Sequence, residues 1–269
     1  MRHAKRRRPM FWILPIVSLL FLCGWFLLNG ESHEVPVPKR MGEEEILRRI
    51  EELADRDPDA AYVLEHREAY PMRLLLSLAN NPEMASFAAG YPGEGAETGG
   101  FTAEEISADR PLLLQWDTRW GYASYGDANI GLNGCGPVCL SMAILSLTGD
   151  ETATPLALAA WAEENGYYVD GCGTEWSFIP DAALYYGVEA REIPLWEDSL
   201  RQELDAGNPV ICCVVEGDFT TSGHFLVLWA MEGDNVTLSD PNCRARSEAQ
   251  WPYDRLAPQI EILWALELA

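Results

Sequence analysis

The sequence has 269 residues, of which 48% are hydrophobic and 23% charged, so its composition excludes a disordered chain. Acidic residues outnumber basic ones by 42 to 19, and the net charge is −23. Nucleic-acid-binding surfaces are basic, so this balance argues against a nucleic-acid partner and favours a solvated, self-repelling acidic surface.

The first 28 residues predict a membrane segment. Residues 1–9 form a basic tail, and residues 10–28 (MFWILPIVSLLFLCGWFLL) contain no charged residue. A run of this length can cross the hydrocarbon core of a bilayer as a helix, with the basic tail on the cytoplasmic side. We therefore expect a single-pass anchor in the cell membrane, with the rest of the chain extracellular. A cleaved signal peptide, which would make the protein secreted, is the alternative.

Residues 29–42 are polar and contain prolines, which is typical of a linker. Residues 43–100 predict a helical spacer region. The expected helices cover residues 43–56, 60–66 and 71–78. Helices this short rarely fold alone, so we expect them to pack on the next domain or to space it from the membrane; inhibition of that domain is a further alternative. The glycine-rich residues 90–100 are a candidate boundary.

Residues 101–269 predict one larger domain in which helices come first and strands follow. Helices are expected over residues 137–147, 156–165, 176–186 and 200–206. Strands are expected over residues 210–215, 224–231 and 236–239, and the apolar residues 112–116 are expected to be extended. Because the last two strands are joined by a short Glu-Gly-Asp-Asn turn, they predict an antiparallel hairpin, and the expected fold class is α+β.

Cys135, His224 and Asp240 are the candidate catalytic residues. Cys135 directly precedes an apolar helix, where the helix dipole favours the thiolate that attacks carbonyl groups. His224 is the only histidine in residues 101–269 and opens a strand, whereas Asp240 follows the next strand. A hairpin returns the chain to its starting end, so the carboxylate can orient the imidazole and the imidazole can activate the thiol.

Attack on a carbonyl also requires a donor for the developing oxyanion. The backbone N–H of Cys135 is one candidate. The side chain of Gln115, at the end of an apolar run, is a second. Asn133 is a third, because it lies closer to the cysteine in sequence.

The spacing of the cysteines does not predict a metal or redox site. Cys135 and Cys139 are spaced CxxxC, which differs from the CxxC of redox motifs. Cys212 and Cys213 lie in an apolar run and are expected to be buried small hydrophobic residues. With one histidine in the domain and no paired CxxC, no metal and no cofactor are expected. Sequence spacing leaves the disulfide pattern open.

Several ordered motifs resemble the exported, papain-like cysteine peptidases of family 39, which are relatives of the bacteriocin-processing peptidase domains of some ABC transporters. The motifs lie at residues 115–121 (QWDTRWG), 125–126 (YG), 134–137 (GCGP), 223–225 (GHF) and 240–242 (DPN). The resemblance spans about residues 112–264. It implies a papain-like fold with Cys135 as nucleophile, His224 as base and Asp240 as the residue that orients it.

The resemblance also matches Gln115 to the family's upstream glutamine. Gln115 lies 20 residues before Cys135, whereas in the transporter-linked members the corresponding glutamine is much closer to the cysteine. The chain shows no transporter part, so the resemblance does not imply processing of a double-glycine leader during export.

These patterns predict a bacterial, membrane-anchored cysteine peptidase that cleaves peptide or protein substrates through a thioester acyl-enzyme. A first alternative keeps the triad and changes the substrate to the cell wall, as an endopeptidase, amidase or transpeptidase of peptidoglycan stem peptides. A second alternative is a non-catalytic binding module on a peptidase fold. A redox role is the least favoured, because of the CxxxC spacing.

Overall fold

The computed structural model describes residues 35–91, 99–171 and 173–269. The expected basic tail (1–9), membrane helix (10–28) and first part of the linker lie outside the described residues, as does most of the glycine-rich candidate boundary. Within the described ranges, no helix combines the length and the apolar character that a membrane crossing requires.

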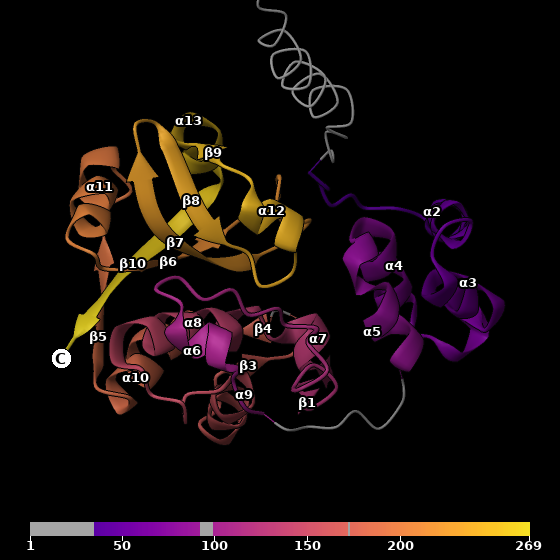
Figure 1. The fold of residues 1–269 in the computed structure, drawn as a ribbon, viewed down its shortest axis with the longest axis horizontal. Coiled ribbons are helices and arrows are strands. Elements are labelled where there is room, and N and C mark those ends of the chain that lie inside the picture. The colour runs from indigo at the N-terminus through magenta and orange to yellow at the C-terminus, as the bar shows by residue number, and fades with distance from the viewer. Residues whose placement is uncertain (1–34, 92–98, 172) are drawn as a thin grey trace, which may run out of the picture. The chain divides into compact units, whose positions relative to one another are not determined.

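The N-terminal part of the described chain is helical. Its helices are α2 (Glu43–Ala54), α3 (Pro58–Glu65), α4 (Met72–Asn80) and α5 (Ala85–Gly90), with the 3₁₀ turns η1 (Arg67–Ala69) and η2 (Pro82–Met84) between them (Figure 1). Ile46, Ile50 and Leu53 form the buried stripe of α2, as the sequence pattern predicts. Asp57 caps α3 by accepting hydrogen bonds from the backbone at its start.

These helices also pack against the following domain. The ring of Phe87 on α5 stacks on Tyr122, with ring centroids 4.5 Å apart. The Tyr122 hydroxyl donates to the Phe87 carbonyl at 2.7 Å. Gly131 permits this approach, because a Cβ atom there would lie 2.4 Å from the Phe87 ring. The helical region and the domain therefore share a packed contact.

The helices of the domain precede most of its sheet. They are α6 (Ala103–Ser107), α7 (Ile130–Asn133), α8 (Cys135–Thr148), α9 (Pro155–Glu164), α10 (Phe178–Tyr185) and α11 (Glu197–Asp205). Four of them, α8 to α11, match predicted helices to within three residues at every end. Residues 136–145 of α8 are all buried, and the helix is capped by Gly149, whose φ of 68° is readily adopted only by glycine.

The main sheet has six antiparallel strands in the order β5-β10-β6-β7-β8-β9. The strands are β5 (Val188–Ile193), β6 (Val210–Val214), β7 (His224–Glu232), β8 (Asn235–Ser239), β9 (Trp251–Pro252) and β10 (Ile260–Leu268). Two short hairpins, β1-β2 (Ser124–Tyr125, Ala128–Asn129) and β3-β4 (Tyr168–Val169, Gly173–Thr174), lie outside it. Residues 112–114 belong to no strand and residues 115–116 lie in a turn, so the expected extended run is not part of the sheet and ends before Gln115.

The central strands are buried on both faces, which explains their continuous apolar sequences. Along β7, Phe225 and Val227 join the core that contains α8, whereas Leu226 and Leu228 join the core under α11 and α13 (Tyr253–Leu256). The sheet is therefore covered by helices on each side, and helices with antiparallel strands give the expected α+β class.

Truncation of a core leucine should test this packing. Leu140 on α8 is completely buried, so Leu140→Ala should lower the free energy of unfolding by about 2–5 kcal/mol through lost contacts and a cavity. Leu184→Ala on α10 is the matched control, because that side chain is 65% exposed and its loss should change stability by about 0.5 kcal/mol or less. Urea unfolding measures both values, and an equal loss in the two variants would contradict the assignment of α8 to the core.

Candidate active site

Cys135 is the first residue of α8 and lines a cavity. Its side chain is partly exposed, whereas the ten residues that follow are buried. Gly136 holds the start of the helix close to β4, because a Cβ atom there would lie 3.0 Å from the Thr174 side chain. A buried helix thus presents its first side chain to the cavity.

His224 and Asp240 meet at the open end of the β7-β8 hairpin. His224 is the first residue of β7, and Asp240 follows the last residue of β8. The imidazole Nε2 and the carboxylate Oδ1 are 2.8 Å apart, and the two residues are 7% and 0% exposed. This bond occupies Nε2 and leaves Nδ1 as the ring nitrogen for the Cys135 side chain, whose pKa responds to His224. The structure therefore brings all three residues together.

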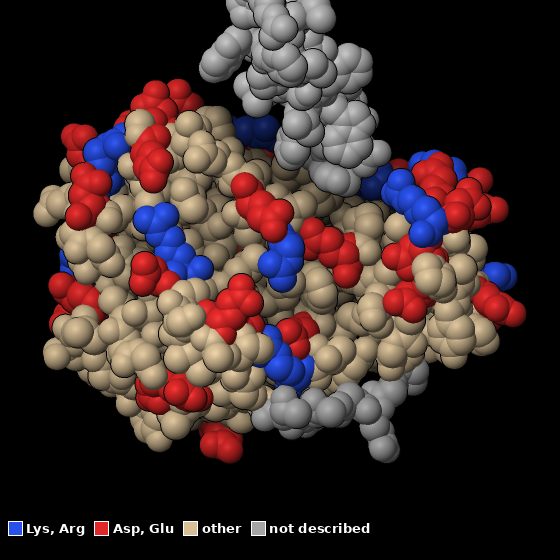
Figure 2. Space-filling model, in the orientation of Figure 1, with Lys and Arg blue, Asp and Glu red and all other residues tan. Residues whose placement is uncertain are grey.

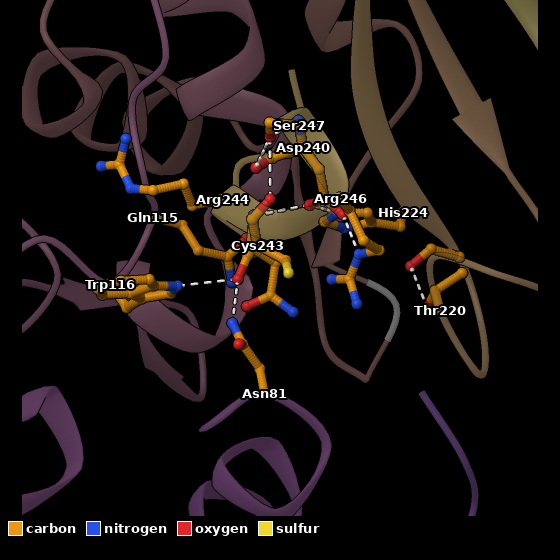
Figure 3. A network of polar contacts seen from close by, with 12 residues as sticks. Asn81, Gln115, Trp116, Thr220, His224, Asp240, Cys243, Arg244, Arg246 and Ser247 are labelled. Atoms are coloured by element: carbon orange, nitrogen blue, oxygen red, sulfur yellow. Dashed lines mark hydrogen bonds and ion pairs between the residues drawn. The ribbon is translucent and has the colours of Figure 1, made fainter. Parts of the chain in front are cut away.

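Arg246, which sequence analysis did not single out, holds the other side of the Asp240 carboxylate. This arginine on α12 (Arg244–Glu248) donates from Nε to Asp240 Oδ2 at 2.5 Å, and both side chains are completely buried (Figure 3). The backbone N–H of Asn242 donates to Oδ1 at 2.7 Å, and the Ser247 hydroxyl accepts from the Asp240 N–H. A buried carboxylate requires a counter-charge. The one sequence feature that could have indicated this partner is the position of Arg246, a basic residue only six positions after Asp240 in an acidic chain.

The charges of this group shift three pKa values. Burial acts to raise the pKa of Asp240, but the charges of Arg246 and His224 outweigh it and lower that pKa to about 2. Burial acts to lower the pKa of His224, but the Asp240 carboxylate and the Cys135 thiolate raise it to about 9. Burial acts to raise the pKa of Cys135, yet His224 and backbone hydrogen bonds at Phe225 and Gly136 bring it below its ordinary value. The shifts of His224 and Cys135 favour the thiolate–imidazolium pair over the neutral thiol and imidazole.

The other described cysteines have raised pKa values, in contrast to Cys135. Cys139, Cys212, Cys213 and Cys243 are buried free thiols, and burial raises the pKa of each. The expectation that Cys212 and Cys213 are buried is confirmed. A thiol reacts as its thiolate, so Cys135 is the one described cysteine suited to nucleophilic attack.

Gln115 lies at the same cavity as Cys135. Its backbone N–H donates to Pro241 O at 2.7 Å, and its side-chain Nε2 donates to Gly131 O at 2.8 Å. An amide nitrogen has two N–H groups, so the second remains available for a bound group. Its Oε1 is buried without a partner among the described residues.

Asn133 also lines the cavity, but its amide is occupied. Nδ2 donates to Tyr125 O and to Asp127 Oδ1, each at 2.9 Å. Its Oδ1 accepts a hydrogen bond from Arg73. Of the two candidate side chains, Gln115 is therefore the one with an N–H group left for an oxyanion.

The cavity has a volume of about 240 Å³ and is lined from both halves of the described chain. Cys135, Gln115 and His224 line it together with the loop 219–223. Pro38, Arg73, Leu76, Ser77, Asn80 and Asn81 line it from the helical region. No three His, Cys, Asp or Glu side chains in the described ranges are arranged to hold a metal ion.

A buried helix that begins at a cysteine, together with an antiparallel sheet that carries histidine and aspartate, defines a papain-like cysteine peptidase. The family model described as the Peptidase_C39 like family matches residues 108–266, more than half of the chain. The protein belongs to this family and is a cysteine peptidase, so the resemblance identified from the sequence motifs is confirmed. No curated protein matches the chain.

The solved structures that match this chain are remote in sequence. The peptidase domain of Streptococcus ComA, a bi-functional ABC transporter involved in quorum sensing, is 20% identical with a TM-score of 0.41, and the match covers 54% of this chain and 96% of that chain. A double glycine motif protease from an AMS/PCAT transporter, solved with its leader peptide, is 17% identical with a TM-score of 0.38 over 59% and 91%. A C39-like peptidase from Bacillus anthracis is 16% identical with a TM-score of 0.37 over 58% and 94%.

Alkylation by iodoacetamide should report the thiolate of Cys135. At pH 6 the labelling rate of Cys135, located by mass spectrometry, should fall at least about tenfold in His224→Ala, because burial then dominates the pKa of the thiol and one pKa unit is tenfold in thiolate. His66→Ala changes an exposed histidine on the helical region and should leave the rate as it is. Equal labelling in wild type and His224→Ala would contradict the paired thiolate.

Removal of the Arg246 charge should destabilise the fold. Arg246→Met leaves Asp240 buried beside His224 alone, and about 3–5 kcal/mol of unfolding free energy should be lost at pH 7. The pKa of Asp240 is lowered by folding, so its stabilisation is complete above about pH 4 and is lost as the pH falls through about 2. The deficit of the variant should therefore shrink in acid.

The matched control for this charge removal is Arg255→Met, which breaks a surface pair with Asp218 and should cost about 1 kcal/mol or less. Chemical denaturation at pH 7 and pH 3 measures both variants. A deficit of Arg246→Met that is small, or that is independent of pH, would refute the role of the ion pair.

Proposed function

We propose that this protein is a membrane-attached, extracytoplasmic peptidase that hydrolyses peptide bonds through a triad of Cys135, His224 and Asp240. The observation that carries the proposal is the continuous chain of contacts from the buried Asp240, through His224, to a partly exposed thiol at a cavity. The apolar residues 10–28 after a basic tail support the membrane attachment.

The proposed reaction has two halves. The Cys135 thiolate attacks the carbonyl carbon of the scissile bond, and the resulting tetrahedral intermediate collapses to a thioester as the imidazolium of His224 gives its proton to the leaving amine. His224, now neutral, then takes a proton from water, which attacks the thioester and releases the acid and the thiolate. Asp240 keeps the imidazole oriented throughout.

Gln115 is the proposed oxyanion donor. Its amide nitrogen uses one N–H for Gly131 O, which fixes the side chain, and the other N–H is free to stabilise the charged oxygen of the intermediate. The backbone N–H of Cys135, at the start of α8, is the proposed second donor. A rigid donor is worth more than a mobile one, because no reorganisation is required during the reaction.

The cavity favours a peptide with small or polar side chains. Arg73, Asn80, Asn81, Thr220 and Ser222 give it a largely polar lining. The face in Figure 2 shows Lys and Arg side chains next to Asp or Glu, without a continuous basic area, which supports a substrate other than nucleic acid. Peptides of extracellular proteins and stem peptides of the cell wall both fit this chemistry.

Substrate assays would test the proposal directly. The soluble protein beginning at Glu31 should hydrolyse members of a mixed peptide library, and Cys135→Ala should abolish the activity. kcat/KM should fall as the pH rises through about 9, where His224 loses the proton that the leaving amine requires. A thioester adduct on Cys135, seen by mass spectrometry after acid quenching, would identify the intermediate.

Purified peptidoglycan provides the second arm of this assay. Release of stem-peptide fragments with D-residues, and no cleavage of the library, would place the enzyme on the cell wall. Absence of cleavage in both arms, with a Cys135 that reacts like an ordinary thiol, would contradict the proposed peptidase and favour a binding module.

A further inference from the structure

Helix α4 contacts both halves of the catalytic site. Its first turn carries Arg73, which reaches the loop before Cys135. The residues just after its end, Asn81 and Glu83, reach the loop after Asp240. The helix spans nine residues, or about 13 Å at 1.5 Å per residue, so these two sets of contacts lie at opposite ends of α4. In Figure 1 both α7 and α12 lie on the same side of α4, the side that faces the domain.

On the nucleophile side, Arg73 binds the turn that leads into α8. Its guanidinium donates to Asn133 Oδ1 and, at 3.4 Å, to Leu132 O. It also forms an ion pair with Asp127 at 3.3 Å. Asn133 lies two residues before Cys135 and is itself tied to Tyr125 O. Arg73 therefore fixes the segment that sets the position of the nucleophile.

On the acid side, Asn81 binds the loop between Asp240 and α12. The Asn81 amide and the Trp116 indole N–H both donate to the Asn242 carbonyl, the latter at 2.9 Å (Figure 3). Asn81 is 1% exposed, so the loss of this bond would leave a buried amide unpaired. The backbone N–H of Asn242 donates to Asp240 Oδ1, so this one residue connects α4 to the triad acid.

Glu83 binds the start of α12 itself. Its carboxylate accepts the backbone N–H of Arg244 at 2.7 Å on Oε2 and that of Ala245 at 2.8 Å on Oε1. The first N–H groups of a helix lack partners within it, so both bonds replace water. Arg246 and Ser247 on this helix hold Asp240. Through α12, Glu83 acts on the orientation of Asp240 and thus of His224.

We propose that Arg73, Asn81 and Glu83 are positioning residues, and that α4 is a brace that keeps Cys135 in register with His224 and Asp240. The inference rests on the proposed triad and makes the helical region an integral part of the catalytic unit. Cys135 comes from the helical layer and the other two residues from the sheet, so their mutual placement depends on contacts that cross between these layers. A shift of about 1 Å at a reacting group can lower a rate about a hundredfold.

The variant Glu83→Gln in the soluble chain from Glu31 tests the brace. Glutamine has one acceptor oxygen instead of two, so α12 loses one of its two bonds to Glu83. kcat for peptide hydrolysis should fall about ten- to a hundredfold with little change in KM, and the pH midpoint of Cys135 alkylation should rise. Glu68→Gln, on a side chain that is 90% exposed, is the matched control and should match wild type in both measurements. Circular dichroism establishes that each variant is folded.

A second variant keeps the test decisive if Glu83→Gln does not fold. Arg73→Lys retains the positive charge but loses the fork that binds Asn133 and Leu132, and it should lower kcat and raise the alkylation midpoint in the same way. Arg67→Lys, at a half-exposed position on η1, is its control.

Two outcomes would overturn the brace. Unchanged kcat and alkylation in folded Glu83→Gln and Arg73→Lys would show that α4 does not position the triad. A rise in kcat would show that the helical region restrains the enzyme instead. Failure of the proposed function has a different signature, which is an unactivated Cys135 in the wild-type chain before any change to α4.

Discussion

The catalytic site depends on one buried ion pair, between Arg246 and Asp240. Both side chains are fully excluded from water, and neither charge could remain buried alone without a large loss of stability. The pair keeps Asp240 ionised, the ionised carboxylate holds the His224 proton, and the resulting imidazolium lowers the pKa of Cys135. The nucleophilicity of the Cys135 thiol thus depends on Arg246, although the two side chains are connected only through Asp240 and His224.

The surrounding fold keeps these charges in place. Helix α8 and the central strands β6 and β7 pack against each other in one core. This packing fixes the position of Cys135, at the start of α8, relative to His224, at the start of β7. The short helix α12 carries both Arg246 and Ser247 to the Asp240 loop. Contacts from Arg73, Asn81 and Glu83 reach the two loops from outside this core. Packing of the core sets the distance between Cys135 and His224, and the hydrogen bonds to the two loops set the orientation of the side chains of the triad.

Sequence patterns predicted the parts of this structure that depend on local or repeated apolar signals. The buried runs at β6 and β7, the proline and cysteine at the start of α8 and the single histidine of the domain all gave correct elements, and the structure brings Cys135, His224 and Asp240 together. Strands β5 and β10 were missed. β5 (VEAREI) is short and half charged, without a regular alternation, and β10 pairs between β5 and β6, a non-local arrangement without a turn signal.

The buried polar contacts were also missed, for a related reason. Arg246 and Glu83 resemble any surface residue in a charged chain, and only the tertiary fold removes Arg246 from water or places Glu83 against α12. Gln115 was a candidate oxyanion donor from the sequence, but its 20-residue separation from Cys135 gave no sign of the cavity that both residues line. Apolar periodicity predicts which elements pack, but the partners of polar groups depend on the complete arrangement of loops.

The protonation state of His224 tests this chain of charges most directly. It is measured by nitrogen-15 NMR of the histidine-labelled protein that begins at Glu31. Both ring nitrogens of His224 should stay protonated through neutral pH, and the ring should titrate near pH 9. In Cys135→Ala the titration should move to lower pH, because the thiolate no longer stabilises the charged ring. Titration of wild-type His224 near its ordinary value of about 6.5, unaffected by Cys135→Ala, would contradict the thiolate–imidazolium pair and the role assigned to Arg246 and Asp240.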